Sequence, residues 1–310
     1  MRGIFMKPLL DIVVVTHNSA DVVDDLLDSL PEALGEITAN VVVVDNDSTD
    51  NTIDLLLKRD DCNVVVSPNV GYAAGINRGV HEGSGAEAIL VLNPDTRLHE
   101  GCIAPLLSAL RLPGTGIVAP RIISETGTPQ LSLRRDYTIL RALGLSRVKF
   151  AAFSEYVQEA EAYEQPHVID WALGAVLMMT RECFDVLGGW DESFFLYSEE
   201  TDLSLRARDH GLATRYEPRS VVMHIGGGSG RSGKTYAMQA INRVRLYRRR
   251  HNRAATWCFY GLTLARELMW ATRGYPERRF VVAAMLRRSL RPAELKCSAS
   301  LLPGWESQPS

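Results

Sequence analysis

The sequence has no long hydrophobic run. None of its windows reaches the ~18 to 20 uncharged apolar residues that a membrane-spanning helix needs, and the nearest one, residues 255–272, is interrupted by an Arg-Glu pair. Near the start, Arg2 and Lys7 precede an apolar run at residues 9–15, but Asp11 interrupts that run and no small-residue cleavage site follows it. We therefore expect a first strand there, and neither a signal peptide nor a spanning helix.

Cysteine is scarce as well. The five cysteines are scattered, odd in number and form no Cys-x-x-Cys pair: Cys62, Cys102, Cys183, Cys258 and Cys297. A chain of 310 residues with 46% hydrophobic content can bury a full core without cross-links. The cysteine pattern therefore argues against a disulfide scaffold and a structural zinc site, and it predicts a reduced, cytoplasmic protein.

Two familiar phosphate-binding signatures are missing. No Gly-x-Gly-x-x-Gly follows the first expected strand, which counts against a dinucleotide-binding fold, and no Gly-Lys-Ser/Thr ends a Walker loop. A different glycine-rich segment, residues 71–79, leads into an expected helix. From Gly71 onward its backbone N–H groups could cradle phosphate, with Asn77 as the better side-chain ligand. For Gly75 and Gly79 the alternative is close helix–sheet packing.

The first half of the chain alternates between strand and helix patterns. Short apolar runs at residues 11–15, 41–44, 64–66 and 89–92 predict buried strands with helices between them. This alternation predicts an α/β fold with a mostly parallel central sheet and right-handed crossovers. The expected helix N-caps are Asn18 or Ser19, and Ser48 or Thr49.

The second half has a different rhythm. A polar stretch at residues 124–166 is long enough to predict a functional lid or a poorly ordered loop. The other expected elements are a helix near 102–110, a strand at 117–119, a strand at 168–180, a helix at about 200–209, and strands near 214 and 221.

The net charge of −3 hides an asymmetry. Residues 231–310 carry 16 Lys and Arg against 4 Asp and Glu, whereas residues 1–230 carry 18 against 33. A basic tail on an acidic body points to a polyanionic partner such as a membrane surface. Arginines flank an apolar-aromatic segment in this tail, as in an interfacial helix. The alternative is a helical appendage that packs its aromatic residues on the main domain.

Polar side chains follow the first two expected strands where each strand ends. Thr16 and Asn18 follow the first, and Asp45, Asn46 and Ser48 follow the second. Ligands of open α/β sheets bind beyond the carboxyl ends of parallel strands. Each group alone could be an ordinary helix cap, but together they favour a nucleotide pocket.

The fourth expected strand ends in Asn93-Pro94-Asp95. Asp95 supplies the hard oxygen that Mg²⁺ or Mn²⁺ prefers, and a diphosphate would complete the coordination shell. His224 also stands at the end of an apolar run, so it is a candidate second ligand. A turn brace for Asp95 and a structural role for His224 are the alternatives.

Adjacent carboxylates Glu199 and Glu200 follow an aromatic segment, residues 194–197. A helix dipole favours carboxylates at a helix start, which would explain them without catalysis. Aromatic neighbours would desolvate a glutamate and raise its pKa toward the range useful to a base. We favour a catalytic role.

The ordered set of motifs resembles family 2 glycosyltransferases, and within that family the bacterial rhamnosyltransferase-like enzymes of cell-surface polysaccharide assembly. The resemblance covers roughly residues 9–230. The motifs are Thr-x-Asn at 16–18, Val-Asp-Asn-x-Ser at 44–48, Asn-x-Gly-Tyr-Ala-x-Gly-x-Asn-x-Gly at 69–79, Leu-Asn-Pro-Asp at 92–95, Trp-x-x-Gly-Ala at 171–175, Gly-Gly-Trp-Asp-Glu-x-Phe-Phe-x-Tyr-x-Glu-Glu-x-Asp-Leu at 188–203, and a later His.

The resemblance implies a GT-A fold, a dTDP- or UDP-linked sugar donor, a divalent metal (Mg²⁺ or Mn²⁺), and transfer with inversion to a glycan or lipid-linked acceptor. It implies no nucleic-acid partner. By position, the implied roles are nucleotide-sugar binding for Thr16, Asn18, Asp45, Asn46, Ser48, Gly71, Asn77 and Asn93, metal binding for Asp95 and His224, general base for Glu200 with Glu199 beside it, and the acceptor side for Trp171, Gly174 and Asp202. Asn93 stands where many relatives have the first Asp of Asp-x-Asp.

The implied organisation is a catalytic domain at residues 1–230 and a basic helical appendage at 231–310. Within the domain, residues 9–120 would bind the nucleotide sugar and 121–230 would carry the acceptor and catalytic side. The protein would be cytoplasmic, either free or peripheral on the inner face of the cell membrane. Two rival functions remain: a sugar-nucleotide pyrophosphorylase, which would normally show an Arg- and Lys-bearing glycine-rich loop after the first strand, and a non-catalytic sugar-nucleotide binding module.

Overall fold

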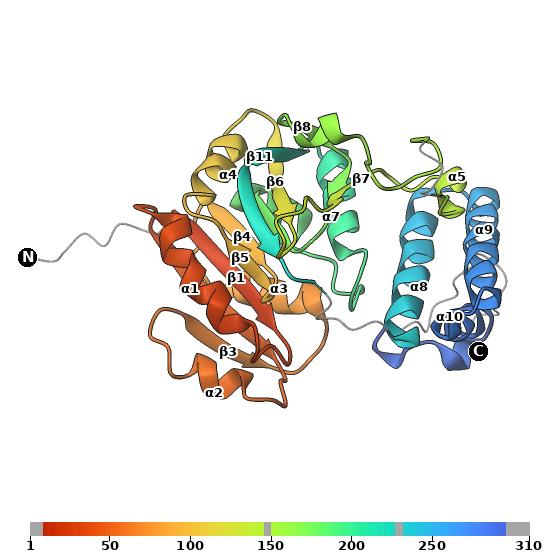
Figure 1. The fold of residues 1–310 in the computed structure, drawn as a ribbon, viewed down its shortest axis with the longest axis horizontal. Helices are drawn as coiled ribbons and strands as arrows, with labels where there is room; N and C mark the ends of the chain where they lie inside the picture. Colours follow the sequence, from red (N-terminus) through yellow and green to blue (C-terminus); the bar gives the residue numbers. More distant parts are fainter. Residues whose placement is uncertain (1–8, 146–149, 227–231, 296–310) are drawn as a thin grey trace, which may run out of the picture.

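The computed structural model describes residues 9–145, 150–226 and 232–295. A nine-stranded sheet crosses the molecule in the order β3-β2-β1-β4-β10-β6-β11-β5, and β8 pairs with β11 (Figure 1). The strands of this sheet are β1 (Leu10–Thr16), β2 (Ala39–Asn46), β3 (Asn63–Ser67), β4 (Ala88–Leu92), β5 (Thr96–Leu98), β6 (Thr115–Ile123), β8 (His167–Ile169), β10 (Val176–Thr180) and β11 (Ala213–His224).

The parallel half of the sheet is β3-β2-β1-β4, as the strand–helix alternation predicts. Its inner strands β1, β2 and β4 are largely buried because helices cover both faces of the sheet, whereas the edge strand β3 is only partly covered. One face packs on α1 (Val23–Leu34) and α4 (Ile103–Leu110), and the other on α3 (Tyr72–His81), α6 (Arg181–Leu187) and α7 (Glu199–Asp209). The parallel register places Thr16 opposite Asp45, so the carboxyl ends of β1 and β2 meet at one edge.

Two expectations about local structure are wrong. The single strand expected at 168–180 is three strands, because the chain leaves the sheet after β8, forms β9 (Trp171–Ala172) against β7 (Leu133–Arg134), and re-enters as β10 antiparallel to β4. The expected N-caps also differ: α1 begins at Val23, and α2 (Thr52–Leu56) begins after Asn51, both without a side-chain cap. The Thr49 N–H instead donates to Oδ1 of Asn18, and the Ser48 hydroxyl donates to Asp45 at the end of β2. The Ser19 N–H donates to the hydroxyl of Thr52 at the start of α2.

The polar stretch at 124–166 carries short elements in its described part. These are β7, α5 (Ile139–Ala142) and η1 (Ala160–Tyr163). Since β7 pairs with β9, the stretch lies over the second half of the sheet. Tyr163 fixes it there, because its carbonyl accepts from the hydroxyl of Tyr216 in β11 at 3.2 Å and its ring packs edge-on against the Tyr216 ring at 5.8 Å.

Three helices end the described chain: α8 (Gly233–Arg250), α9 (Arg253–Thr272) and α10 (Pro276–Leu286), followed by η2 (Arg288–Leu290) and η3 (Ala293–Leu295). They lie at the end of the molecule away from β3 (Figure 1). Their core is shared with Tyr137, Trp171 and Phe194, and Phe259 of α9 tilts against Tyr137 at 6.2 Å. Packing of tail aromatics on the main domain, one of the two alternatives, is therefore confirmed. In the described residues no helix is both long and apolar enough to cross a membrane.

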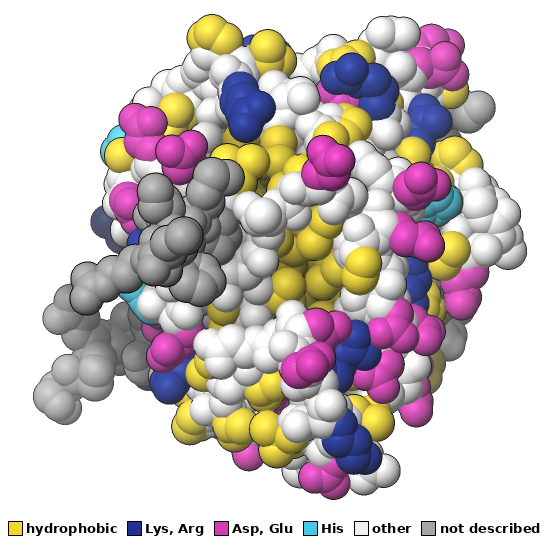
Figure 2. Space-filling view, turned by 90° about the vertical axis from the view of Figure 1, so that its left-hand side faces the viewer, with side chains coloured by type: hydrophobic (Ala, Val, Ile, Leu, Met, Phe, Trp, Pro, Cys, Tyr) yellow, Lys and Arg dark blue, Asp and Glu magenta, His cyan; other side chains and the backbone are white. Residues whose placement is uncertain are grey.

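The opposite end of the molecule has a different surface. Hydrophobic side chains gather in a central hollow of this face, and Asp and Glu side chains are spaced around it (Figure 2). Lys and Arg are scattered singly among the side chains drawn there. The acidic character of residues 1–230 is therefore visible on the face farthest from the C-terminal helices.

Candidate active site

The polar residues at the ends of β1 and β2 form one hydrogen-bonded group, which we call the strand-end network: Thr16, Asn18, Asp45 and Ser48. The hydroxyls of Thr16 and Ser48 donate to Oδ2 of Asp45 at 2.9 and 2.6 Å, and the Ser48 N–H donates to its Oδ1 at 2.9 Å. The backbone N–H of Asn18 donates to the Ser48 hydroxyl at 2.8 Å. The convergence expected from the sequence is confirmed, whereas contact of these groups with a nucleoside stays a prediction.

The start of α3 contacts both this network and the second half of the chain. The Asn46 amide donates to the carbonyl of Gly71 at 3.1 Å, and its Oδ1 is buried without a hydrogen bond from the described residues. Gly71 has a φ of 115°, and a Cβ there would lie 2.8 Å from the carbonyl oxygen of Phe195. The Tyr72 N–H donates to that same oxygen at 2.8 Å. Gly71 is therefore required for close approach of the segment before the two glutamates.

Two later glycines of α3 serve helix–sheet packing. A Cβ at Gly75 would meet a Val15 methyl at 2.8 Å, and one at Gly79 would overlap Val13. The packing alternative is therefore confirmed for both positions, because the helix lies so close to β1 that a side chain has no room.

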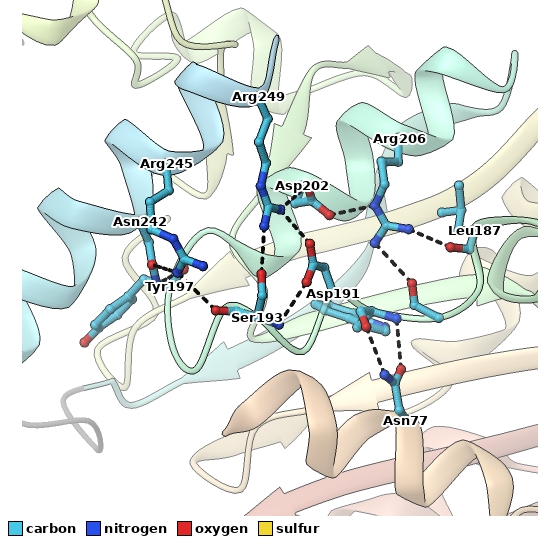
Figure 3. Close-up of polar contacts among 12 residues, drawn as sticks. Asn77, Leu187, Asp191, Ser193, Tyr197, Asp202, Arg206, Asn242, Arg245 and Arg249 are labelled. Atoms are coloured by element: carbon cyan, nitrogen blue, oxygen red, sulfur yellow. Dashed lines mark hydrogen bonds and ion pairs between the residues drawn. The ribbon is translucent and has the colours of Figure 1, made fainter. Parts of the chain in front are cut away.

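Asn77 takes a different place from the one expected. Its Nδ2 donates to the Trp190 carbonyl and to Oε1 of Glu192, both at 2.9 Å, and its Oδ1 accepts from the Trp190 N–H at 2.9 Å. Because these protein groups use its amide, we correct its role from nucleotide ligand to structural link. It ties α3 to the segment that precedes the glutamate pair (Figure 3).

Asp95 and His224 come together because β5 pairs antiparallel with β11. This register sets His224 opposite Thr96, and the Asp95 carboxylate lies 3.4 Å from Nε2 of the imidazole. Burial by itself would raise the pKa of Asp95, but the hydrogen bond and charge of His224, with a backbone N–H from Gly226, hold this pKa below its usual value. Nδ1 of His224 is buried without a hydrogen bond from the described residues.

Asn93 lies next to this pair but faces another partner. Its Oδ1 accepts from the Tyr72 hydroxyl at 2.7 Å, and its backbone N–H donates to the Ala175 carbonyl at 2.8 Å. Among the described residues, no group of three or more His, Cys, Asp or Glu side chains converges in metal-binding fashion. A cation here would therefore take two protein ligands, Asp95 and His224, and draw the rest from a bound ligand or water.

The glutamate pair, Glu199 and Glu200, opens α7 in an apolar environment. Burial raises the pKa of Glu199 well above its ordinary value, and the charge of Glu200 adds to the rise. Burial also raises the pKa of Glu200, to about 7. One carboxylate oxygen of each is buried without a hydrogen bond from the described residues. Such uncompensated groups are costly, and near-neutral pKa values are what a general base uses.

The backbone around this pair is strained and closely packed. Tyr197 and Ser198, just before it, have left-handed φ values of 69° and 75°, which are rare for residues other than glycine. A Cβ at Gly174 would lie 3.1 Å from Cβ and 3.3 Å from Cγ of Glu200. Gly174, expected on the acceptor side, therefore lies directly against Glu200.

Sequence reasoning missed Tyr72 and Arg134. Burial raises the pKa of Tyr72 far above its ordinary value, and the carboxylates of both glutamates and of Asp95 add to the rise, so its ring lies between the two groups of carboxylates. The guanidinium of Arg134 lies 4.1 Å over the Tyr156 ring and partly offsets the rise in the pKa of Glu200. It has no ion-pair partner in the part of the chain described. Arg134 lies in a strand of only two residues, β7, which no periodicity reveals.

Helix α8 holds the segment that leads into the glutamate pair (Figure 3). Asn242, buried completely, donates to the carbonyls of Leu196 and Tyr197 at 2.9 and 3.1 Å. From the same helix, Arg245 donates to the Ser193 carbonyl at 3.0 Å. The left-handed residues are therefore fixed by a helix that the sequence assigned to an appendage.

Asp202 belongs to this bracing and not to an open acceptor side. Its carboxylate accepts from Arg206 at 2.6 Å and lies 3.7 Å from Arg249. Arg249 also pairs with Asp191, and Arg206 donates to the carbonyls of Leu187 and Gly189 (Figure 3). Since these arginines use its oxygens, we correct its expected role to a structural one.

Trp171 is almost fully buried. Its indole N–H donates to the carbonyl of Arg135 at 3.1 Å, and its ring packs edge-on against Tyr137 at 6.0 Å. The Arg134 guanidinium lies 5.9 Å from the same ring. Trp171 therefore supports the side of the site that carries Arg134, and its contact with an acceptor stays a prediction.

The arrangement brings three chemical functions to the same side of one sheet. The strand-end network is a polar rim, Asp95 and His224 are a two-ligand cation site, and the glutamate pair offers a desolvated base. Tyr72 connects the last two, and Gly71 connects the first and last through Phe195. A base, a cation site and a polar rim suit displacement of a charged leaving group by a hydroxyl.

Comparison with known protein families gives two matches. The family described as "Glycosyl transferase family 2" matches residues 11–163, and "Glycosyl transferase family group 2" matches residues 88–294. Among curated proteins, an N-acetylglucosaminyl-diphospho-decaprenol L-rhamnosyltransferase of Mycobacterium tuberculosis is 31% identical over 239 residues, covering 71% of this chain and 76% of the relative. The Haloferax volcanii low-salt glycan biosynthesis hexosyltransferase Agl10 is 29% identical, covering 66% of this chain and 62% of that protein.

Solved structures share the fold at low sequence identity. A mannosyltransferase from Pyrobaculum calidifontis, in complex with GDP-Man and Mn²⁺, has a TM-score of 0.55 at 15% identity, covering 94% of this chain and 83% of that one. GalNAc-T7 with UDP, GalNAc and Mn²⁺ has a TM-score of 0.58 at 18% identity. That match covers 77% of this chain, which spans about half, 47%, of the GalNAc-T7 chain.

Proposed function

Because this chain belongs to family 2 of the glycosyltransferases and has the GT-A fold, we propose that it transfers a sugar, with inversion, from a nucleoside-diphosphate sugar to a hydroxyl. Glycosyltransferase activity in glycan or cell-wall synthesis is what the family and its relatives support. The observation that carries the proposal is the glutamate pair at the start of α7, in which one carboxylate oxygen of each residue is buried without a hydrogen bond from the described residues.

The chemistry of the proposed transfer depends on Glu200. As the acceptor hydroxyl oxygen attacks C1 of the sugar, Glu200 takes its proton, and the C1–oxygen bond to the nucleoside diphosphate breaks. The contact with Gly174 limits where the Glu200 side chain can point. The negative charges of Glu199 and Glu200 repel each other. This repulsion helps to keep the pKa of the pair raised, so that the pair can accept a proton. Neither rival function, pyrophosphorylase or non-catalytic binding module, uses such a base.

The residues at Asp95 fit a divalent cation. Asp95 offers a carboxylate and His224 an imidazole, and Asp95 and Nε2 of His224 are 3.4 Å apart. The GT-A neighbours named above were solved with Mn²⁺, and carboxylate with diphosphate oxygens suits Mg²⁺ or Mn²⁺. When bound, the cation would neutralise charge on the departing diphosphate. Gln130 supports this position, because its amide donates to the His224 carbonyl at 2.8 Å.

The donor we propose is a dTDP- or UDP-linked deoxyhexose, with rhamnose first. The support is the L-rhamnosyltransferase named above, at 31% identity. The strand-end network offers hydroxyl, amide and carboxylate groups at the position where a pyrimidine nucleoside would bind. The acceptor we propose is a lipid-linked glycan intermediate, since that relative is named for an N-acetylglucosaminyl-diphospho-decaprenol. With such an acceptor the protein would work on the inner face of the cell membrane.

The direct test is a donor panel with a matched inactive variant. Purified protein is incubated with Mn²⁺, a lipid-diphospho-N-acetylglucosamine acceptor and each of dTDP-rhamnose, UDP-GlcNAc, UDP-Gal and GDP-Man, and glycosylated product is measured by mass spectrometry. We expect product from dTDP-rhamnose, and none from Glu200→Gln with the same donor. Product from another donor only would replace the proposed sugar. When pyrophosphate is added, formation of sugar-1-phosphate together with the nucleoside triphosphate, in place of transfer, would indicate a pyrophosphorylase and contradict the proposal.

A further inference from the structure

Helix α9 buries the charged residues of its interior and exposes a side without charge. Its two interior charged residues, Arg266 and Glu267, point into the protein: Glu267 is 0% exposed, and its carboxylate accepts from Arg266 at 2.7 Å and from Arg278 of α10 at 2.8 Å. A helix that faces water normally has the reverse arrangement. The buried charges are therefore used for packing α9 against α10, and the outer side is left without them.

The outer side of α9 has no exposed charged residue between Arg253 and Arg273. We call the exposed residues in that interval the α9 outer face: Ala254, Trp257, Cys258, Gly261, Ala265, Leu268 and Thr272. They recur at helical spacing over nearly the whole helix. Trp257 is 41% and Leu268 is 51% exposed. Further large apolar side chains are exposed before, on and after α10: Tyr275, Phe280, Leu286 and Leu290.

The exposed charged residues that follow the α9 outer face along the described chain are cationic. Arg273, Arg279, Arg287 and Arg288 are exposed, whereas none of the carboxylates at described residues 251–295 is exposed. The four arginines nearer the main domain do not contribute, because Arg243, Arg245, Arg249 and Arg250 bond to Glu155, Ser193, Asp191 and Asp209. The expected tail-wide basic patch is therefore confined to the far end of the helices.

We propose that the α9 outer face and the exposed arginines that follow it dock on an anionic lipid bilayer. The charge decides the partner: an apolar surface followed by exposed arginines, with no exposed carboxylate, complements anionic headgroups above an acyl layer. The opposite end of the molecule bears spaced carboxylates (Figure 2), so an anionic membrane would favour the α9 end. In one respect this inference rests on the proposed function, since it would bring the active site to a lipid-linked acceptor.

The test uses the full-length protein and sedimentation with vesicles. With phosphatidylglycerol–phosphatidylcholine vesicles we expect binding that falls as salt rises and is weak with phosphatidylcholine alone. Leu268→Glu together with Trp257→Glu should reduce binding at least tenfold, and Arg287→Gln with Arg288→Gln should reduce it on anionic vesicles only. Leu57→Glu is the matched control, because Leu57 is apolar, 67% exposed and distant in sequence from α9. Equal binding by all variants would overturn the proposal.

A second measurement separates docking from self-association. An environment-sensitive fluorophore on Cys258, with Cys62 and Cys297 replaced by Ser, should show a blue shift when anionic vesicles are added. If light scattering instead shows a dimer that Leu268→Glu dissociates, and vesicles leave the probe unchanged, the face is a contact between copies and the lipid proposal is wrong. Transfer to a short-chain, water-soluble acceptor should be unchanged in Leu268→Glu. Wild-type protein that transfers the sugar but does not bind anionic vesicles would overturn docking alone, whereas vesicle binding by a wild-type protein without any transfer would overturn the proposed function alone.

Discussion

At the scale of single residues, Glu200 should set the pH dependence of turnover. Its pKa is raised to about 7, first by burial, and a general base must be ionised to act. The rate should therefore increase as the pH rises through about 7 and then level off. Single-turnover rates from pH 5 to 9 would show this limb. Glu200→Gln should lower the rate by about 10² to 10⁴ and abolish the limb, and a limb that persists in this variant would identify another base.

Arg134 should move that limb. Its positive charge lowers the pKa of Glu200, against the larger effect of burial. Arg134→Gln removes the charge, so the pKa of Glu200 should rise and the limb should shift to higher pH. Arg135→Gln is the matched control, because Arg135 is already paired with Glu159. If both variants leave the limb in place, the Arg134 charge does not act on the base.

Glu199 should cost the protein stability at neutral pH. Its pKa is raised in the folded state by burial and by Glu200, so the folded protein holds this proton more tightly than the unfolded chain. Stability is therefore lost as the pH rises above the unfolded value of about 4.3. Glu199→Gln should raise the Tm, and the difference from wild type should grow between pH 5 and 8. The exposed Glu182 gives the control, since Glu182→Gln should change the Tm little at any pH.

At the scale of elements, the sequence predicts those with a regular period and misses those set by contacts far apart in the chain. The parallel strands β1, β2 and β4 are predicted correctly because their apolar runs are buried on both faces. The strand expected at 168–180 is wrong because pairing of β9 with β7, about forty residues earlier, pulls its middle from the sheet. The role of α8 was also missed, since nothing near Asn242 shows that it holds Leu196 and Tyr197.

The bracing by α8 predicts an effect on turnover from a residue outside the site. Asn242→Ala removes both hydrogen bonds to the left-handed segment before Glu199, leaving two buried carbonyls unpaired at a cost of about 1–3 kcal/mol. The Tm should fall by a few degrees, kcat should fall more than tenfold, and donor affinity from calorimetry should be retained. Gln239→Ala, at an exposed position of the same helix, should leave all three unchanged. Loss of donor affinity equal to the loss in kcat would mean that α8 supports the whole fold and not the glutamate pair.

At the scale of the whole molecule, the sequence predicts the opposite charges of the tail and the body correctly, but it does not show which of these charges pair with each other. The basic tail and the acidic body are opposite in sign as counted, but much of this charge is paired across the two. Arg243, Arg249 and Arg250 bond to carboxylates of the body. Composition cannot distinguish arginines that attach a helix to its own protein from those that face a partner, because that depends on the tertiary contacts of each one.

For the candidate site, the sequence likewise predicts which residues come together better than it predicts the role of each one. Strand-end positions predicted that Thr16, Asp45 and Ser48 would meet, because the parallel pairing of β1 and β2 brings their ends together. They also predicted that Asp95 would meet His224, which the antiparallel pairing of β5 with β11 brings about. The same reasoning could not show that Asn77 and Asp202 are used by protein partners, because those partners lie on segments whose placement no pattern predicts.

Ligand binding should raise the Tm of the whole chain. Measurements of this rise can distinguish binding at the cation site from binding at the strand-end network. A ligand that binds only the folded state at about 100 times its Kd adds about 2.7 kcal/mol, which corresponds to a rise in Tm of roughly 5 °C or more. We expect dTDP with Mn²⁺ to produce such a rise, and dTDP with a chelator to produce a smaller one. Asp95→Ala should remove the difference between these conditions and keep the smaller rise, because the strand-end network does not include Asp95. Ser48→Ala should reduce both, since its hydroxyl bonds to Asp45 and accepts from Asn18. An Asp95→Ala variant whose Tm still responds to Mn²⁺ as the wild type does would show that the cation binds elsewhere.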